Sequence, residues 1–176
     1  MVKSSTQPAL GAIRLAWWRE ALERLDASPP PPEPRLQAIA AELLPRGIAG
    51  KELARLEDGW AALLDEEPHA ERLLERGALL FGLAARLLGQ SDPLIEAAGR
   101  LYSYQAYREC ELPQLPLPNE ELHRLHGHRF ERRLRPLTAL ARLAARDAKR
   151  SPYREAEATP GRAAALLSHR LSGRVD

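Results

Sequence analysis

The amino-acid sequence predicts an all-α protein, and three observations support this fold class. Alanine, leucine, arginine and glutamate, which favour helices, dominate the composition. Isoleucine, valine and threonine are few, and no alternation of apolar and polar residues lasts for the length of a strand. Apolar residues recur instead at intervals of three and four. The length of 176 residues suits one domain with a substantial core, so we expect a single helical domain over residues 1–176.

The first predicted helix runs from Pro8 to Asp26 and contains the adjacent residues Trp17 and Trp18. Its apolar residues follow the i, i+3/i+4, i+7 spacing of a helix with a broad buried face. Pro8 suits the first turn of a helix, whereas the prolines at 29–32 form a stiff spacer in which a helix cannot continue. We therefore expect a core helix whose indole N–H groups find hydrogen-bond partners.

Prolines, glycines and capping residues divide the remaining sequence into further helices. Gly89 closes a long helix, Asp92 can cap the helix after it, and Asn119 can cap another. Pro136 breaks or kinks the pattern that follows. The predicted helices cover residues 35–44, 50–64, 68–88, 93–111, 119–134, 136–150 and 160–171, with a proline-containing linker at 112–118 and a loop at 151–159.

The charged residues are distributed unevenly along the chain. Residues 122–176 contain 13 Arg and Lys against 5 Asp and Glu, whereas residues 1–121 contain 13 against 19. This asymmetry indicates either an anionic partner for the basic third or arginines that only solvate helix faces. The last two helices combine leucine and alanine stripes with arginines, so contact with an anionic membrane surface would be electrostatic. Regularly interleaved aromatic residues are missing from the basic third, and we expect no specific nucleic-acid recognition.

Several features bear on the compartment. No apolar run approaches the roughly 18–20 residues that span a bilayer, and the N-terminal residues lack the apolar region of a secretory signal. The single cysteine, Cys110, excludes an internal disulfide and fits a reducing compartment. We therefore expect a cytoplasmic protein, and a peripheral position on the inner face of the membrane is an alternative.

Five segments resemble bacterial members of the squalene/phytoene synthase family, and the resemblance extends from about Pro8 to Arg174. They are IRLAWWREAL (13–22), GWAALLDEEP (59–68), GALLFGLAARLLG (77–89), RFERRLRPLTALARLAARDAKR (129–150) and LLSHRLSGR (166–174). The resemblance implies a helical bundle of the isoprenoid synthase type, which here lacks the first helix because the chain begins too late. It also implies an enzyme that joins two prenyl diphosphates and holds Mg²⁺ with two DxxxD motifs.

Neither of the acidic motifs that the resemblance requires occurs in this chain. No two of its six aspartates lie four residues apart. The first motif would fall near residues 2–7, which read VKSSTQ. The second would fall on the helix 94–111, where Glu109 and Glu111 diverge by about 200° around the helix axis. Because Mg²⁺ needs converging carboxylates, we expect no catalytic residue, no metal ligand and no cofactor.

The resemblance without its motifs implies a degenerate, non-catalytic pseudoenzyme that acts as an assembly, scaffold or isoprenoid-binding protein. The same family contains the branch of mitochondrial complex I assembly factor 6, which is regarded as an assembly protein. The alternative is an Mg²⁺-dependent, head-to-head prenyl diphosphate transferase whose N-terminal part is missing from this chain. Expected partners are another protein or a second copy, bound through an apolar face near Trp17 and Leu22 that the missing helix leaves uncovered. An isoprenoid ligand and an anionic membrane surface are further alternatives.

Four residues are candidates for a cavity or a partner contact: Trp17, Trp18, Tyr104 and Arg108. The last two lie on the helix where the second acidic motif would be. The Tyr104 hydroxyl either lines a polar cavity or packs between helices with a carbonyl or water as its partner. Arg108 either binds a diphosphate or pairs with Glu111.

Two groups of side chains resemble metal sites but have ordinary explanations. One is an acidic ladder near the start of the helix 68–88, where carboxylates commonly offset the helix dipole. The other is a histidine cluster in which one ring points away and no Cys or Asp completes a tetrahedral set. His169, in the last helix, is expected to belong to a basic face. The two groups are Glu67, Glu71 and Glu75, and His123, His126 and His128.

Overall fold

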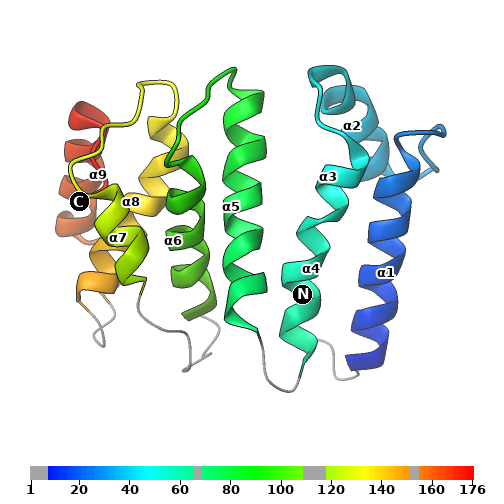
Figure 1. Cartoon of the computed structure of the whole chain (residues 1–176), viewed down its shortest axis with the longest axis horizontal. Helices are drawn as coiled ribbons and strands as arrows, with labels where there is room; N and C mark the ends of the chain where they lie inside the picture. Colours follow the sequence, from blue (N-terminus) through cyan, green and yellow to red (C-terminus); the bar gives the residue numbers. More distant parts are fainter. Residues whose placement is uncertain (1–7, 66–68, 109–117, 151–154) are drawn as a thin grey trace. The chain divides into compact units, whose positions relative to one another are not determined.

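The computed structural model describes residues 8–65, 69–108, 118–150 and 155–176, and these ranges contain helices and no strand (Figure 1). The predicted all-α class is therefore confirmed for the described residues. Within the same ranges, no helix combines the length and the apolar character that crossing a membrane requires. The chain forms two compact units, Met1–Arg76 and Gly77–Asp176, and α5 (Ala70–Leu87) contributes to both.

Unit 1 is built around the contact between its first helix and two short ones. A small core contains buried Ala21 of α1, Leu25 just after α1, and Leu36. The half-buried ring of Trp18, also on α1, packs against this core. The predicted helix 50–64 is divided into three shorter pieces. Besides the start of α5, the helical elements of unit 1 are α1 (Pro8–Arg24), α2 (Pro34–Glu42), η2 (Leu44–Arg46), α3 (Gly50–Ala54), α4 (Leu56–Ala61) and η3 (Ala62–Leu64).

A close approach of backbones joins α3 to α1. A Cβ atom added at Gly50 would collide with the carbonyl oxygen of Leu22, so this position has no room for a side chain. The carboxylate of Asp26 accepts hydrogen bonds from the backbone N–H groups of Gly50 (2.5 Å) and Lys51 (3.0 Å). Asp26 therefore caps α3 from the chain that follows α1, as an N-terminal capping side chain does.

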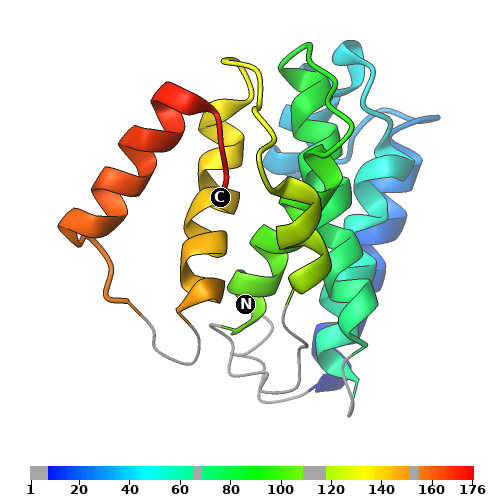
Figure 2. The same cartoon turned by 60° about the vertical axis from the view of Figure 1, so that its left-hand side comes forward.

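Unit 2 contains the rest of α5 and four further helices. In Figure 2, α8 lies between α6 and α9, and it packs against both of them. The core contains fully buried Phe81, Leu101 and Phe130. Backbones also meet at Gly77 and Gly99, where a Cβ atom on either residue would collide with the carbonyl oxygen of the other. The four helices are α6 (Ile95–Arg108), α7 (Asn119–Leu125), α8 (Arg135–Lys149) and α9 (Pro160–Ser172).

The predicted helix 119–134 is wrong beyond Leu125. Gly127 has a φ of +73°, a left-handed conformation that glycine adopts readily and that ends helices. The chain then pairs with the C-terminal segment, because the Phe130 N–H donates to the Gly173 carbonyl oxygen (3.0 Å). An isolated β-bridge between residues 129 and 174 continues this pairing. Pro136 lies in the first turn of α8, where its missing N–H leaves no helical hydrogen bond unmade.

Candidate functional site

The two tryptophans of α1 differ in exposure. Trp17 is 47% exposed and forms a stripe with Ile13 (64%) and Leu10 (47%), at the spacing i, i+3, i+7. We call these three side chains the α1 face. Trp18 is half-buried, and its ring meets that of Trp17 edge to face at 5.1 Å. The prediction of a core helix is thus confirmed at Leu25 near the end of α1, and it is wrong for the α1 face.

A groove of about 460 Å³ lies beside Trp17, between α1 and the prolines that follow it. Glu20 and Arg24 line this groove and form an exposed ion pair at 2.8 Å. Arg14, three residues before Trp17, is exposed and has no ion pair within the described residues. The α1 face is therefore apolar, with one ion pair and one unpaired arginine beside it.

The other two candidates, Tyr104 and Arg108, lie one turn apart on α6. Tyr104 is buried, with 2% of its surface exposed. The guanidinium carbon of Arg108 lies 5.9 Å from the centre of the Tyr104 ring, a cation–π distance. Glu111, the expected partner of Arg108, lies outside the described residues. The structure therefore groups the candidates as two pairs, the tryptophans in unit 1 and Tyr104 with Arg108 in unit 2.

The aspartates of unit 1 all form structural contacts. Asp26 caps α3, as described above. Asp58 and Asp65 both bind the guanidinium of Arg72, at 2.8 Å and 2.7 Å. The hydrogen bonds from Arg72 lower the pKa of Asp58. These carboxylates therefore act as charge partners and helix caps.

The three aspartates of unit 2 are engaged in the same way. Asp147 is 3% exposed, and both of its oxygens accept hydrogen bonds of 2.7 Å from Arg162. Asp92 accepts a bond from a backbone N–H at the start of α6, and its carboxylate lies 3.0 Å from His128. Asp176 accepts a bond of 3.0 Å from a backbone N–H in the turn after α7. All six aspartates of the chain thus have partners within its own fold.

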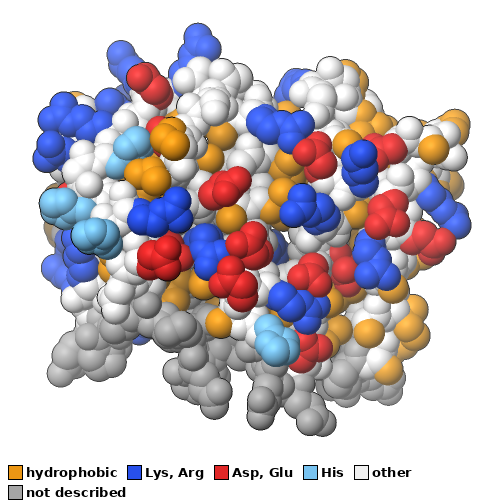
Figure 3. Space-filling model, in the orientation of Figure 1, with side chains coloured by type: hydrophobic (Ala, Val, Ile, Leu, Met, Phe, Trp, Pro, Cys, Tyr) orange, Lys and Arg blue, Asp and Glu red, His pale blue; other side chains and the backbone are white. Residues whose placement is uncertain are grey.

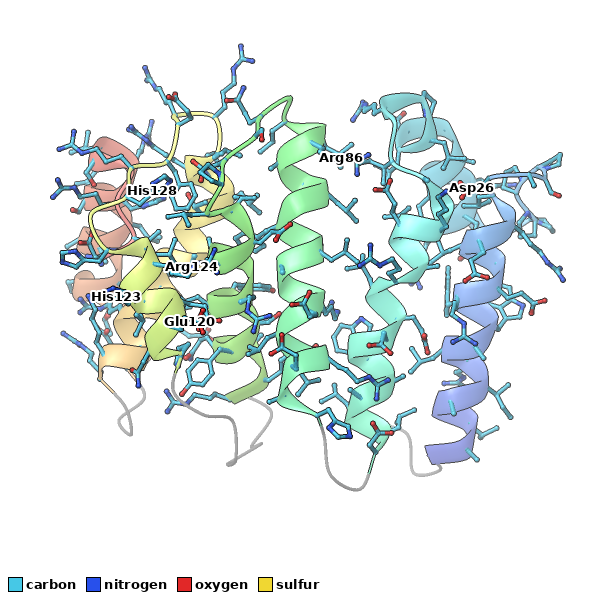
Figure 4. The ribbon with its side chains drawn as sticks, viewed as in Figure 1. Asp26, Arg86, Glu120, His123, Arg124 and His128 are labelled. Carbon is cyan, nitrogen blue, oxygen red and sulfur yellow. The ribbon has the colours of Figure 1, made fainter. Side chains whose placement is uncertain are left out.

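The described ranges contain no group of three or more His, Cys, Asp or Glu side chains that could hold a metal ion. His128 is bound to Asp92, and Figure 4 shows His123 on α7, apart from it. His126 is exposed and lies 3.7 Å from Asp176. The acidic ladder begins at Glu67, which lies outside the described residues, as does Cys110.

His169 was expected on a basic face, and this prediction is wrong because the residue is 1% exposed. Its Nδ1 lies 2.7 Å from the Arg174 carbonyl oxygen, and its Nε2 lies 3.0 Å from the Thr138 hydroxyl. Because a carbonyl can only accept, Nδ1 carries a proton. The Thr138 hydroxyl has a single proton, which it donates to the Leu134 carbonyl oxygen (3.1 Å), so this hydroxyl lies beside Nε2 without donating to it. Burial lowers the pKa of His169. The surrounding arginines in the sequence gave no sign of this buried position.

Many arginines of the basic third are held by the fold, so the prediction that they only solvate helix faces is wrong for them. Arg142 donates to the Val175 carbonyl oxygen at 2.8 Å. Arg146 and Arg150 both bind Glu155, at 2.6 Å and 3.0 Å. Hydrogen bonds from Arg146 and the Thr159 hydroxyl lower the pKa of Glu155 to about 2.

A second set of arginines has no ion pair and no side-chain hydrogen bond within the described part of the chain. In Figure 3, basic side chains gather along the left edge of the view, where α9 lies. The members of this set that lie between α7 and α8 or near the end of α9 are Arg129, Arg132, Arg133 and Arg170.

Two members of this set border a groove of about 870 Å³ between the start of α8 and the end of α9. Sequence reasoning did not predict this groove, although the run RFERRLR before α8 signals its basic rim. We call it the α8–α9 groove. Its lining residues are Arg132, Arg135, Pro136, Ala139, Leu166, Leu167, His169, Arg170 and Leu171.

Comparison of the chain with protein-family models, with curated proteins and with solved structures found no match.

Proposed function

We propose that this chain is a non-catalytic scaffold protein, built on a bundle of the isoprenoid synthase type and degenerate with respect to squalene/phytoene synthases. The observation that supports this proposal most is the engagement of all six aspartates in caps and ion pairs. Asp58 and Asp147 are bound by arginine through both oxygens and could hold Mg²⁺ only by giving up part of this pairing, and an orphaned, half-buried Arg162 would be strongly destabilising. The carboxylates of this fold serve its stability.

The proposed contact surface is the α1 face. Its three side chains form an exposed apolar stripe, beside which lie the ion pair of Glu20 and Arg24 and one unpaired arginine, Arg14. An apolar stripe with little net charge beside it can pack against its own copy across a two-fold axis. Tryptophan is among the side chains that contribute most to protein interfaces. The proposed partner is therefore a second copy of this chain, in the cytoplasm or at the inner face of the membrane.

The non-catalytic part of the proposal is tested with the purified chain, farnesyl or geranylgeranyl diphosphate, and added Mg²⁺. We expect no release of inorganic diphosphate and no coupled hydrocarbon product. Turnover that depends on Mg²⁺ would overturn the proposal in favour of the prenyl diphosphate transferase alternative. Mass spectrometry of lipids extracted from the purified chain tests the isoprenoid-binding alternative.

The contact surface is tested by sedimentation velocity over a range of protein concentrations. We expect the wild-type chain to self-associate and the double variant Ile13→Ser/Trp17→Ser to remain monomeric. Leu88→Ser is the matched control, because Leu88 is also an exposed leucine (42%) but lies at the end of α5, outside the α1 face. A wild-type chain that sediments as a monomer at every concentration would contradict self-association.

A further inference from the structure

The outer side of α9 is unusually apolar for an exposed helix. Ala165 and His169 are buried on its inner side. On its outer side, Leu167 is 59% exposed and Leu171 is 73% exposed, and with exposed Ala164 they follow the spacing i, i+3, i+7. A helix that is apolar on both sides normally has both sides covered. The outer leucines of α9 therefore indicate a surface that a partner covers.

The charges around these leucines identify the kind of partner. Residues 129–135 contain four arginines and a single acid, exposed Glu131. Arg132 and Arg170 line the α8–α9 groove, and neither has an ion pair within the described part of the chain. The backbone bridge between residues 129 and 174 brings two more exposed arginines together at the same end of α9. Because the positive charges are not neutralised here, the partner must be anionic.

The groove has a fixed frame, which makes it a preformed surface. Arg135 donates to the carbonyl oxygens of Arg170 (2.8 Å) and Leu171 (3.0 Å) and to that of Phe130 (3.2 Å). This guanidinium thereby caps the last turn of α9 and holds it beside the start of α8. Arg135 lines the groove, so its positive charge remains there although backbone carbonyl oxygens accept its hydrogen bonds.

We infer that the α8–α9 groove and the outer leucines of α9 bind the surface of an anionic phospholipid membrane. In this arrangement, Leu167 and Leu171 enter the boundary between headgroups and acyl chains, while Arg132 and Arg170 contact lipid phosphates. A single-stranded nucleic acid would need aromatic side chains for stacking, and the lining of the groove contains none except the buried His169. This inference rests on the proposed function only in placing the chain at the inner face of the membrane. It does not involve α1.

Vesicle flotation with the full chain tests this inference, using phosphatidylcholine alone and phosphatidylcholine mixed with phosphatidylglycerol. We expect binding to the mixed vesicles only, and release at high salt because exposed charges are screened. The double variant Arg132→Gln/Arg170→Gln removes two charges and should weaken binding by roughly 25-fold, at about fivefold for each arginine. The double variant Leu167→Ser/Leu171→Ser should weaken binding by at least about tenfold, because it removes the apolar part of the contact.

Arg46→Gln/Arg55→Gln is the matched control for charge, because both residues are exposed arginines in unit 1 that lie outside the α1 face. This variant should bind mixed vesicles as the wild type does, and circular dichroism confirms that each variant is folded. Equal weakening by the control would show that only net charge matters and would overturn the assignment of the groove. Failure of the wild type to bind mixed vesicles would also overturn it, in favour of an acidic protein as the partner. Prenyl diphosphate turnover and self-association test the proposed function separately, so the two failures are distinguishable.

Discussion

The α1 and α9 helices both expose an apolar stripe, but the charges beside the two stripes differ. The α1 face lies beside the ion pair of Glu20 and Arg24 and a single unpaired arginine, Arg14. The stripe on α9 lies beside arginines such as Arg132 and Arg170 that have no ion pair within the described residues. An exposed apolar stripe therefore does not by itself define a partner. The charge balance beside it distinguishes a neutral partner from an anionic one.

The two helices also differ in how they are attached to their units. Asp26, beyond the end of α1, is exposed and caps α3 through backbone N–H groups. Near the start of α9, Arg162 pairs with the buried carboxylate of Asp147, and near its end His169 contacts Thr138. Breaking a buried polar contact costs much more free energy than breaking an exposed one. Variants of the contacts that hold α1 and α9 should therefore lower the free energy of unfolding by different amounts.

The largest effect is expected at the buried pair of α9. Replacing Asp147 with Ala leaves the guanidinium of Arg162, whose side chain is 17% exposed, without its partner. The free energy of unfolding should fall by about 3 kcal/mol, measured by urea denaturation. Glu157→Ala is the control, because Glu157 is exposed and its removal should change the free energy by less than about 0.5 kcal/mol. Similar values for both variants would show that α9 does not depend on this pair.

The attachment of α1 should respond to a single added methyl group. Gly50→Ala places a Cβ atom against the carbonyl oxygen of Leu22, so the backbones of α1 and α3 must separate. We expect a loss of about 2 kcal/mol in the free energy of unfolding, typical of an overpacked contact. Gly82→Ala, in α5, meets no atom within 4 Å and should raise stability by about 0.5–1 kcal/mol. If both variants changed stability in the same direction, the close approach of α1 and α3 would be refuted.

A smaller, pH-dependent effect is expected at the end of α9. Burial lowers the pKa of His169 below its ordinary value of 6.5, so the unfolded chain takes up the proton first as the pH falls. The free energy of unfolding should therefore decrease below about pH 6.5, as the pH approaches the folded pKa. His169→Gln should remove this contribution, and the difference between about pH 7.5 and 5.5 should become smaller than in the wild type. An unchanged pH dependence would show that the pKa of His169 is the same in the folded and unfolded states.

The smallest effect is expected at the ion pair beside the α1 face. Glu20 and Arg24 are both exposed and lie at the spacing i, i+4. Glu20→Gln should lower the free energy of unfolding by no more than about 0.5 kcal/mol, because solvent screens this pair. Thermal unfolding in low and high salt checks this value, since the small difference should disappear in high salt. A loss comparable to that of Asp147→Ala would remove the contrast between the two attachments.

The helical class and most helix positions could be predicted because they follow from local patterns. Pro8, Gly89 and Pro160 each mark a helix end in the sequence and in the structure. The end of α7 could not be predicted in the same way. The segment after Gly127 leaves the helix to pair with residues 173 and 174, a contact between distant parts of the chain. Helix propensity carries no information about such pairing.

The candidate residues show the same limit. Periodicity placed Trp17 on an apolar stripe correctly, whereas the exposure of that stripe was expected only from the family resemblance. The buried position of His169 depends on the hydroxyl of Thr138, on a different helix, and on the carbonyl of Arg174. The α8–α9 groove arises where two helices meet, so no single segment of the sequence describes it.

The hydrogen bond from the Phe130 N–H to the Gly173 carbonyl oxygen closes a loop that contains both α8 and α9. Deuterium can therefore replace the hydrogen of the Phe130 amide only when this hydrogen bond breaks and the C-terminal segment separates from the turn before α8. The exchange rate at this one position therefore measures how often the C-terminal segment separates from that turn.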